Sequence, residues 1–280
     1  MSIARTLLLT AVAMLAFAGN SLLCRIALRE TPIDPTSFTS LRIIAGALTL
    51  WLLVRVNRPR RTGAAHWLSA CALFAYAIAF SLAYVSLSAA TGALLLFGAV
   101  QVTMIGAGLA RGERFDARQW MGFATAIVGL GGLLIPGVTA PPLLGASLMI
   151  AAGVAWGIYS LRGRAGGDPT ATTAGNFMRA VPLAIVASVI ALPWFGFDVE
   201  GALYALASGA LASGIGYAIW YAALPALSAT SAATVQLSVP VIAAFGGVVL
   251  LDEPLTSRLS IASVLVLGGI ALVISSRRRS

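Results

Sequence analysis

The chain is built from long apolar runs separated by short polar segments. Each run is about 20 residues long, the length that an α-helix needs to cross the hydrocarbon core of a bilayer. Proline, glycine and charged residues gather in the breaks between the runs, where they end the helices. The pattern predicts an all-α integral membrane protein with ten transmembrane helices, at residues 6–27, 36–56, 66–87, 89–110, 118–136, 142–162, 171–193, 200–222, 229–251 and 257–275.

The first run admits a second interpretation, as a secretory signal. Arg5 precedes it, and a small-residue cleavage motif ends at Ala18. The apolar character continues to Cys24, however, and cleavage after Ala18 would leave only nine spans. We therefore interpret residues 6–27 as a working membrane helix that carries Asn20 in its middle.

The arginines predict how the chain is oriented. All 18 basic residues are arginine, and only two of them, Arg29 and Arg258, fall in outer loops when the amino terminus is placed inside. Thirteen fall in cytoplasmic segments: Arg5, Arg55, Arg58, Arg60, Arg61, Arg111, Arg114, Arg118, Arg162, Arg164, Arg277, Arg278 and Arg279. Cytoplasmic loops carry the excess of positive charge. Both termini are thus predicted to be cytoplasmic, in a bacterial-type inner membrane.

The two halves of the chain repeat each other. Residues 87–115 match residues 227–255, with Glu113 facing Glu253, and the segment from Phe17 to Arg25 matches the segment from Trp156 to Arg164. Each half holds five predicted spans, an odd number, so the second half enters the bilayer from the opposite side. Inverted repeats of this kind place a substrate path near the bilayer midplane. The predicted units are residues 1–138 and 139–280.

These features resemble the EamA family of the drug/metabolite transporter superfamily. The resemblance is carried by two five-helix repeats, an aromatic and glycine-rich first helix that ends in a cation, an arginine in the second helix, and Gly-Glu or Asp-Glu after the fourth. The resemblance covers essentially the whole chain. Within the family, the chain is similar to the aromatic amino acid exporters of the YddG type. In one departure, Phe17-Ala18-Gly19-Asn20 stands where the family often has Trp-Gly and a polar residue. The resemblance implies export of small metabolites.

The amino-acid composition limits the kinds of molecule that the protein is expected to bind. Hydrophobic residues make up 59% of the chain, charged residues 10%, and the mean hydropathy is +0.95, so no soluble domain is expected. Membrane topology explains the net charge of +9 better than nucleic acid does. Cys24 and Cys71 lie in apolar runs and indicate neither a disulfide nor a metal site. We expect no cofactor and no metal, with lipid and a small-molecule substrate as the partners of a functional monomer.

All nine acidic residues map to loops or span ends, and the single histidine, His66, lies at a span end. Proton pumps relay protons through membrane-buried Asp, Glu or His. The sequence therefore predicts a uniporter or exchanger. Intramembrane catalysis is disfavoured because the chain has no His-Glu-x-x-His motif and no pair of membrane aspartates, and we expect no catalytic residues.

Five polar residues within the spans are candidate substrate-binding groups. Arg42 and Arg179, in the second helix of each repeat, suit a carboxylate or phosphate, but their matching positions also fit a shared structural role. Asn20, Gln101 and Gln236 can equally bond a solute or a neighbouring helix. Arg25, nearer the outer rim, favours a structural role.

Aromatic residues away from the membrane interfaces are the remaining candidates. Such stripes usually pack helices together, but lipid would leave a tyrosine hydroxyl unpaired. The candidates are Phe17, Tyr76, Phe80, Tyr84, Phe97, Trp156, Tyr159 and Tyr217. Five tryptophans near span ends are interpreted instead as interface anchors: Trp51, Trp67, Trp120, Trp194 and Trp220. Pro240 interrupts the ninth span and is hypothesised to be a gating hinge.

The sequence thus favours a secondary transporter that exports small organic metabolites by alternating access. Amino acids, particularly aromatic or other apolar ones, are the expected substrates. Phosphorylated or nucleotide-linked metabolites are the alternative within transport, and an ion or solute channel is the alternative of a different class.

Overall fold

The computed structural model describes residues 2–57, 65–112, 114–137, 140–162, 168–227, 232 and 235–276. This part of the chain is helical and contains no strand. The predicted boundary between the repeats, at 138 and 139, lies outside the described residues. So do Glu113 and seven of the arginines that set the predicted orientation or repeat: Arg58, Arg60, Arg61, Arg164, Arg277, Arg278 and Arg279.

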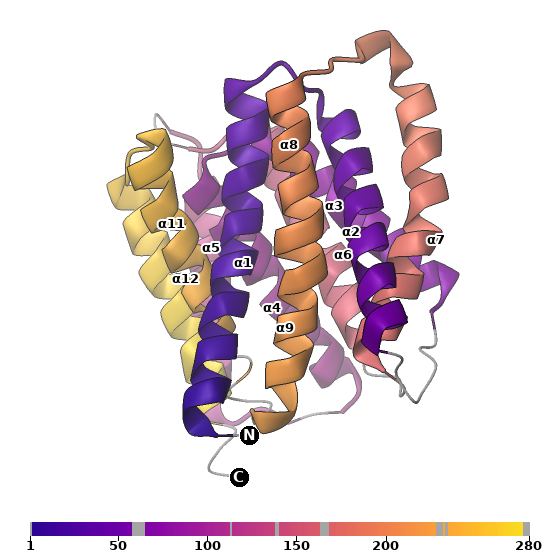
Figure 1. The fold of residues 1–280 in the computed structure, drawn as a ribbon. Helices are drawn as coiled ribbons and strands as arrows, with labels where there is room; N and C mark the ends of the chain where they lie inside the picture. Colours follow the sequence, from indigo (N-terminus) through magenta and orange to yellow (C-terminus); the bar gives the residue numbers. More distant parts are fainter. Residues whose placement is uncertain are drawn as a thin grey trace.

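The helices follow one another up and down the molecule (Figure 1). The longer ones are α1 (Ile3–Glu30), α2 (Pro35–Asn57), α3 (Trp67–Tyr84), α4 (Ala89–Ala110), α5 (Ala117–Leu134), α6 (Leu143–Arg162), α7 (Pro169–Ile190), α11 (Ser238–Leu251) and α12 (Ser257–Ser276). Between α7 and α11 lie η1 (Leu192–Trp194), α8 (Val199–Ala207), η2 (Ser208–Ile215), α9 (Gly216–Ala223) and η3 (Leu224–Ala226). α8, η2 and α9 join into one continuous helix.

Short polar side chains fix where several helices begin. Ser88, Asp168 and Asp198 each precede a helix and accept a hydrogen bond from a backbone N–H of its first turn. Asp116 and Gln119 form a reciprocal capping box at the start of α5. Because the first N–H groups of a helix have no partner within it, these caps satisfy them at the polar ends of apolar segments.

The outer surface of the bundle is apolar. Leu8, Val186 and Phe245, on three different helices, are 64%, 57% and 70% exposed. Within the described residues, eight helical segments are long and apolar enough to cross a membrane: α1, α2, α3, α4, α6, α7, the α8–η3 rod and α12. A water-soluble protein would not leave such a surface exposed. The chain is therefore an integral membrane protein.

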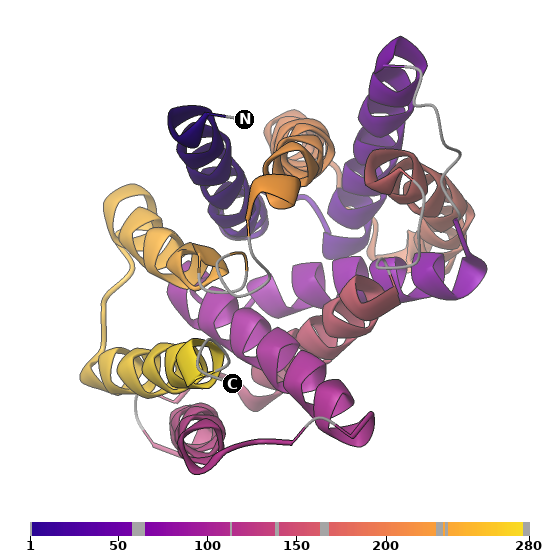
Figure 2. The same cartoon turned by 90° about the horizontal axis from the view of Figure 1, so that it is seen from below.

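Helices of the first half of the chain pack mainly on helices of the second. α2 packs on α7, α3 and α4 pack on α6, α1 packs on α9 and α11, and α5 packs on α12. The α5–α12 pair lies at one edge of the bundle (Figure 2). There, Gly122 of α5 and Gly269 of α12 allow the two backbones to approach closely, since a Cβ atom on either would lie 2.5 Å from the carbonyl oxygen of the other.

The ninth predicted span is interrupted three residues before Pro240. It was expected to be a helix over residues 229–251 with a kink at Pro240, but α11 begins at Ser238, and Leu237 before it is a turn. Pro240 is the third residue of α11, and residues 235–236 before the turn are helical too, so the missing N–H is the one that would bond the carbonyl of Gln236. The break at Leu237 therefore lies in the turn before Pro240, where a proline disrupts a helix, and the role of Pro240 as a hinge stays a prediction.

Candidate functional site

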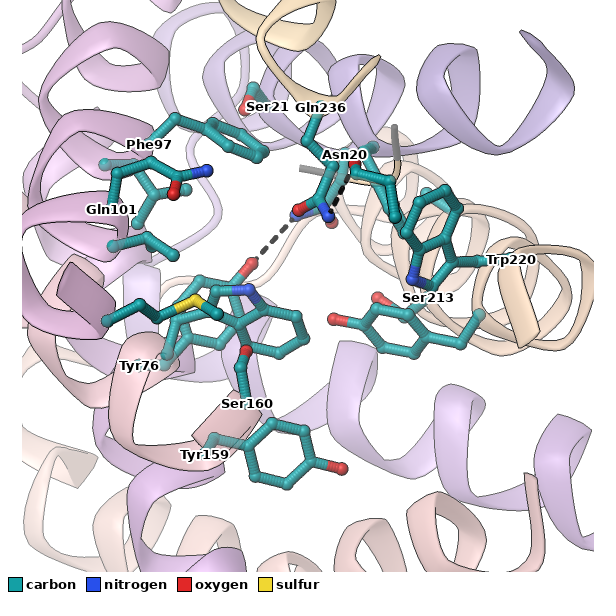
Figure 3. A pocket seen from close by; sticks show the side chains of 18 of the residues that line it. Asn20, Ser21, Tyr76, Phe97, Gln101, Tyr159, Ser160, Ser213, Trp220 and Gln236 are labelled. Atoms are coloured by element: carbon teal, nitrogen blue, oxygen red, sulfur yellow. Dashed lines mark hydrogen bonds between the residues drawn. The ribbon is translucent and has the colours of Figure 1, made fainter. Parts of the chain in front are cut away.

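A cavity of about 480 Å³ lies inside the bundle (Figure 3). It begins in mid-bundle, at Asn20 of α1 and Tyr76 of α3, and extends along α6 and α9 towards the end where α1 begins. Its lining residues are Phe17, Asn20, Ser21, Tyr76, Phe80, Leu96, Phe97, Val100, Gln101, Met104, Trp156, Tyr159, Ser160, Ala212, Ser213, Tyr217, Trp220, Tyr221, Leu224, Leu227, Ala232 and Gln236.

Aromatic rings from four helices form a continuous wall. Trp156 of α6 stacks on Tyr217 of α9, with ring centroids 5.4 Å apart, and on Tyr159 at 5.2 Å. The Tyr76 ring lies 4.8 Å from Trp156, and Phe17 of α1 lies 5.7 Å from Tyr217. Offset and tilted arrangements at these distances are the favourable ones for aromatic pairs. The wall offers a flat apolar surface on which a planar solute can lie.

A chain of hydrogen bonds crosses the mid-bundle end of the cavity. The amide nitrogen Nδ2 of Asn20 donates to the Tyr76 hydroxyl at 3.3 Å (Figure 3), and the Ser208 hydroxyl donates to Oδ1 of Asn20 at 2.7 Å. Ser208 is the first residue of the π-helical segment η2, which also supplies Ala212 and Ser213 to the lining. Irregular helix turns of this kind frequently occur at functional sites.

Arg42 lies behind this polar end. Its side chain is 2% exposed, and its Nη2 donates to the Tyr76 hydroxyl at 2.9 Å. Its guanidinium carbon lies 5.2 Å from the ring centroid of Tyr76 and 5.0 Å from that of Phe80, within the range of cation–π attraction. Nη1 is buried without a hydrogen-bond partner among the described residues. Arg42 therefore acts on the cavity through Tyr76 and does not line it.

A second polar cluster supports the opposite wall. Asn176 of α7 donates from Nδ2 to the Tyr159 hydroxyl at 3.4 Å, and Thr173 donates to the Tyr221 hydroxyl at 3.1 Å. Oδ1 of Asn176 accepts from the backbone N–H of His66 at 3.1 Å. These bonds occupy the tyrosine hydroxyls that lipid would leave unpaired, and they hold the two rings against the cavity.

The lining carries no formal charge in the part of the chain that the structure describes. Gln101 and Gln236 add uncharged amides, and the Gln236 Nε2 donates to the carbonyl of Ala232 at 3.3 Å, within its own segment. Gln101 forms no hydrogen bond within the described ranges and points towards the open space in Figure 3. The site combines an aromatic wall with neutral donors and acceptors.

The opposite end of the bundle is closed by an ion pair. Nε of Arg25 lies 2.9 Å from Oε1 of Glu253, and Nη1 of Arg25 donates to the carbonyl of Tyr84 at 2.8 Å. The second carboxylate oxygen of Glu253 accepts the backbone N–H of Ala89 at 2.7 Å, at the start of α4. Glu253, which follows α11, thereby connects α1 to the start of α4, and Arg25 connects α1 to the end of α3. Because Arg25 stands one helical turn beyond Ser21, this network seals the cavity on that side.

Ten of the thirteen candidate substrate-binding residues come together at the cavity: Phe17, Asn20, Tyr76, Phe80, Phe97, Gln101, Trp156, Tyr159, Tyr217 and Gln236. Arg42, Tyr84 and Arg179 lie outside its lining. The Tyr84 hydroxyl donates to the carbonyl of Ala89 at 3.4 Å, and Nη1 of Arg179 donates to the carbonyl of Gly175 in its own helix at 3.2 Å. The matching positions of Arg42 and Arg179 therefore do not give matching contacts.

Trp220 corrects one interpretation. It was expected to anchor the membrane interface, but its side chain is 8% exposed and lines the cavity, 6.1 Å from Phe17. Ser21, Ser160 and Ser213 also line the cavity and were not singled out from the sequence. Ser21 and Ser160 occupy matching positions in the two repeated segments, so the repeat itself contained the signal that could have found them.

Comparison with known proteins identifies the family. The sequence profile of the EamA-like transporter family matches the chain twice, over residues 4–135 and 143–275. The chain belongs to the EamA-like transporter family. This confirms the resemblance to the EamA family, and the similarity to YddG-type exporters stays a prediction. The protein is thus a transporter of the drug/metabolite superfamily, built from membrane-spanning helices.

Several relatives of this EamA-like transporter match over most of their length. An uncharacterised protein of Pseudomonas aeruginosa is 57% identical over 98% of this chain and 96% of its own. An uncharacterised transporter of Archaeoglobus fulgidus is 25% identical over 98% of this chain and 99% of its own. The uncharacterised transporter YoaV of Bacillus subtilis is 24% identical over 85% of this chain and 86% of its own. A crystal structure with a TM-score of 0.66 and 18% identity covers 100% of both chains and shows the same fold.

Proposed function

We propose that this EamA-like transporter is a secondary carrier that exports small apolar or aromatic amino acids by alternating access, as a uniporter or exchanger. The observation that carries the proposal is the cavity itself. It is aromatic and uncharged within the described residues, and it is sealed at one end by the Arg25–Glu253 pair while it extends to the other. A cavity accessible from one side at a time is what a carrier needs.

Packing between the halves supports an inverted repeat. If α1 to α5 are exchanged with their counterparts α6, α7, the α8–α9 rod, α11 and α12, the principal contacts map onto one another: α1 on α9 becomes α6 on α3, and α1 on α11 becomes α6 on α4. α2 on α7 and α5 on α12 map onto themselves. We infer ten transmembrane helices in two repeats, residues 1–138 and 139–280, with both termini cytoplasmic in an inner membrane and a monomer as the functional unit.

The charge distribution supports transport without proton coupling. Neither a carboxylate nor an imidazole lines the cavity in the described part of the chain. Glu253 is buried at the closed end of the bundle, but it is already paired with Arg25 and with the backbone N–H of Ala89. A proton relay would need a titratable group that both sides can reach in turn.

Counterflow in liposomes tests the proposal. Purified protein is reconstituted, the vesicles are preloaded with unlabelled L-phenylalanine, and uptake of radiolabelled L-phenylalanine is followed without a pH gradient. We expect transient accumulation that protein-free vesicles do not show. Uptake that never exceeds equilibrium would indicate a channel, and uptake only under a pH gradient would overturn the uncoupled mechanism.

A further inference from the structure

The polar end of the cavity presents hydrogen-bond donors. The Tyr76 hydroxyl oxygen accepts from Arg42 at 2.9 Å and from Asn20 at 3.3 Å. A phenol has one O–H donor and two acceptor lone pairs. With both lone pairs occupied, the O–H proton of Tyr76 is left to point into the cavity. The Asn20 amide has a second N–H, and its oxygen is already occupied by Ser208. A solute at this end therefore meets two donors.

Arg42 makes these donors selective for an anion. It is buried, and neither of the ion pairs in the described residues involves it, so its positive charge has no counter-ion there. Its Nη1 is also without a hydrogen-bond partner among those residues. A buried unpaired charge is unfavourable, and an anion bound next to Tyr76 would relieve it through one intervening hydroxyl. Hydrogen bonds to ionised acceptors are about twice as strong as neutral ones.

The repeat shows that this arrangement is not a general requirement of the fold. Arg179 stands at the matching position of the second half, yet it is only partly buried and donates to the carbonyl of Gly175 in its own helix. A shared structural role would give both arginines similar contacts. Of these two arginines, Arg42 alone forms a hydrogen bond with a lining residue of the cavity, Tyr76, among the described residues.

A cationic group would find no counter-ion in the described lining. The described lining contains no carboxylate, so an ammonium group would find neutral acceptors such as Gln101 and Ser160 and the faces of aromatic rings, which attract a cation. It would also experience the positive potential of Arg42. A doubly charged phosphate would need more than one cation, and Arg42 is the only one coupled to the lining within the described ranges.

We infer that the solute is recognised through a carboxylate that accepts hydrogen bonds from Tyr76 and Asn20, backed by the charge of Arg42, and that its α-amino group is dispensable. The substrate class is then aromatic and apolar monocarboxylates, with or without an amine. The inference rests on the proposed function, because it concerns the solute that this carrier moves.

Binding of congeners tests the inference apart from transport. Quenching of intrinsic tryptophan fluorescence in detergent, with Trp156 and Trp220 in the lining, reports binding of L-phenylalanine, 3-phenylpropanoate and phenethylamine. We expect 3-phenylpropanoate to bind at least as tightly as L-phenylalanine, and phenethylamine about tenfold more weakly or worse, as the loss of one charge-assisted hydrogen bond predicts. Equal binding of phenethylamine and 3-phenylpropanoate would overturn the inference.

Two substitutions locate the donor. Tyr76→Phe keeps the ring and removes the hydroxyl, and we expect the affinity for 3-phenylpropanoate to fall about tenfold or more. The matched control is Tyr204→Phe on α8, whose hydroxyl donates to Oε1 of Glu200 at 3.1 Å outside the lining. Arg42→Gln removes the charge, and we expect it to abolish the preference for 3-phenylpropanoate over its uncharged amide. An equal loss in Tyr76→Phe and Tyr204→Phe would overturn the inference even if Arg42→Gln does not fold.

The two proposals fail separately. Counterflow of L-phenylalanine without binding of 3-phenylpropanoate would overturn the carboxylate inference and leave the carrier intact. Binding of 3-phenylpropanoate that depends on Tyr76, without counterflow of any congener, would overturn the carrier and leave the binding site.

Discussion

The aromatic wall of the cavity depends on contacts between individual rings. Trp156 occupies the centre of the aromatic wall, stacked on Tyr159 and Tyr217 and close to Tyr76. An aromatic pair contributes about 0.5–1.5 kcal/mol beyond the area that it buries. The removal of this ring therefore affects both the wall and any planar solute that lies on it.

Trp156→Ala is expected to raise the KM for L-phenylalanine counterflow about tenfold or more, because the solute loses its stacking surface and the neighbouring rings lose their support. Trp194→Ala is the matched control. Its side chain is 74% exposed in η1, far from the cavity, and its removal should leave KM unchanged. An unchanged KM in Trp156→Ala would show that the stack is packing alone.

Residue type and position along a span identified most of the lining, because a mid-membrane polar or aromatic side chain must turn inward or find a partner. They could not distinguish Arg42 from Arg179, since the same type at matching positions has different neighbours. They also misplaced Trp220, because nearness to the end of a span predicts depth and not which face of the helix the residue occupies.

At the scale of helices, the length of each apolar run and the residues that flank it set the bounds of most elements. Asp168 and Asp198 mark helix starts that any capping rule would find. The π-helical segment Ser208–Ile215, which packs against α2 and α1, carries no comparable signal. The break at Leu237, by contrast, has a signal in the sequence, because Pro240 follows it by three residues.

The α5–α12 contact lies outside the cavity lining, so a substitution there should change stability and not transport. Gly122→Ala should lower the melting temperature, because its Cβ would lie 2.5 Å from the carbonyl oxygen of Gly269, and such overpacking costs about 1–3 kcal/mol. Gly131→Ala on the same helix meets nothing within 4 Å and should be neutral or stabilising, since alanine is favoured over glycine in helices. Thermal unfolding in detergent, with counterflow KM unchanged in both, checks this prediction. A higher melting temperature for Gly122→Ala than for Gly131→Ala would contradict the close contact.

At the scale of the whole molecule, alternating access requires each end of the bundle to open and close in turn. In this structure the Arg25–Glu253 pair joins α1 to the segment after α11, and it also joins the ends of α3 and α4. These helices come from both halves of the chain. A rocking motion that opened this end would therefore have to break one partly buried ion pair and the bond from Ala89 to Glu253.

Glu253→Gln should weaken this closure, because the amide keeps the shape of the side chain and loses its charge. Accessibility of a thiol at Ser21→Cys, with Cys24 and Cys71 replaced by serine, reports which end is open to a membrane-impermeant reagent. We expect labelling only from the side of the termini when Glu253 is intact, and additional labelling from the opposite side in Glu253→Gln. Glu30→Gln is the control, because it breaks an exposed ion pair with Arg29 at the same end of α1. If both substitutions changed labelling equally, or neither did, closure of this end would have to come from apolar packing between the helices.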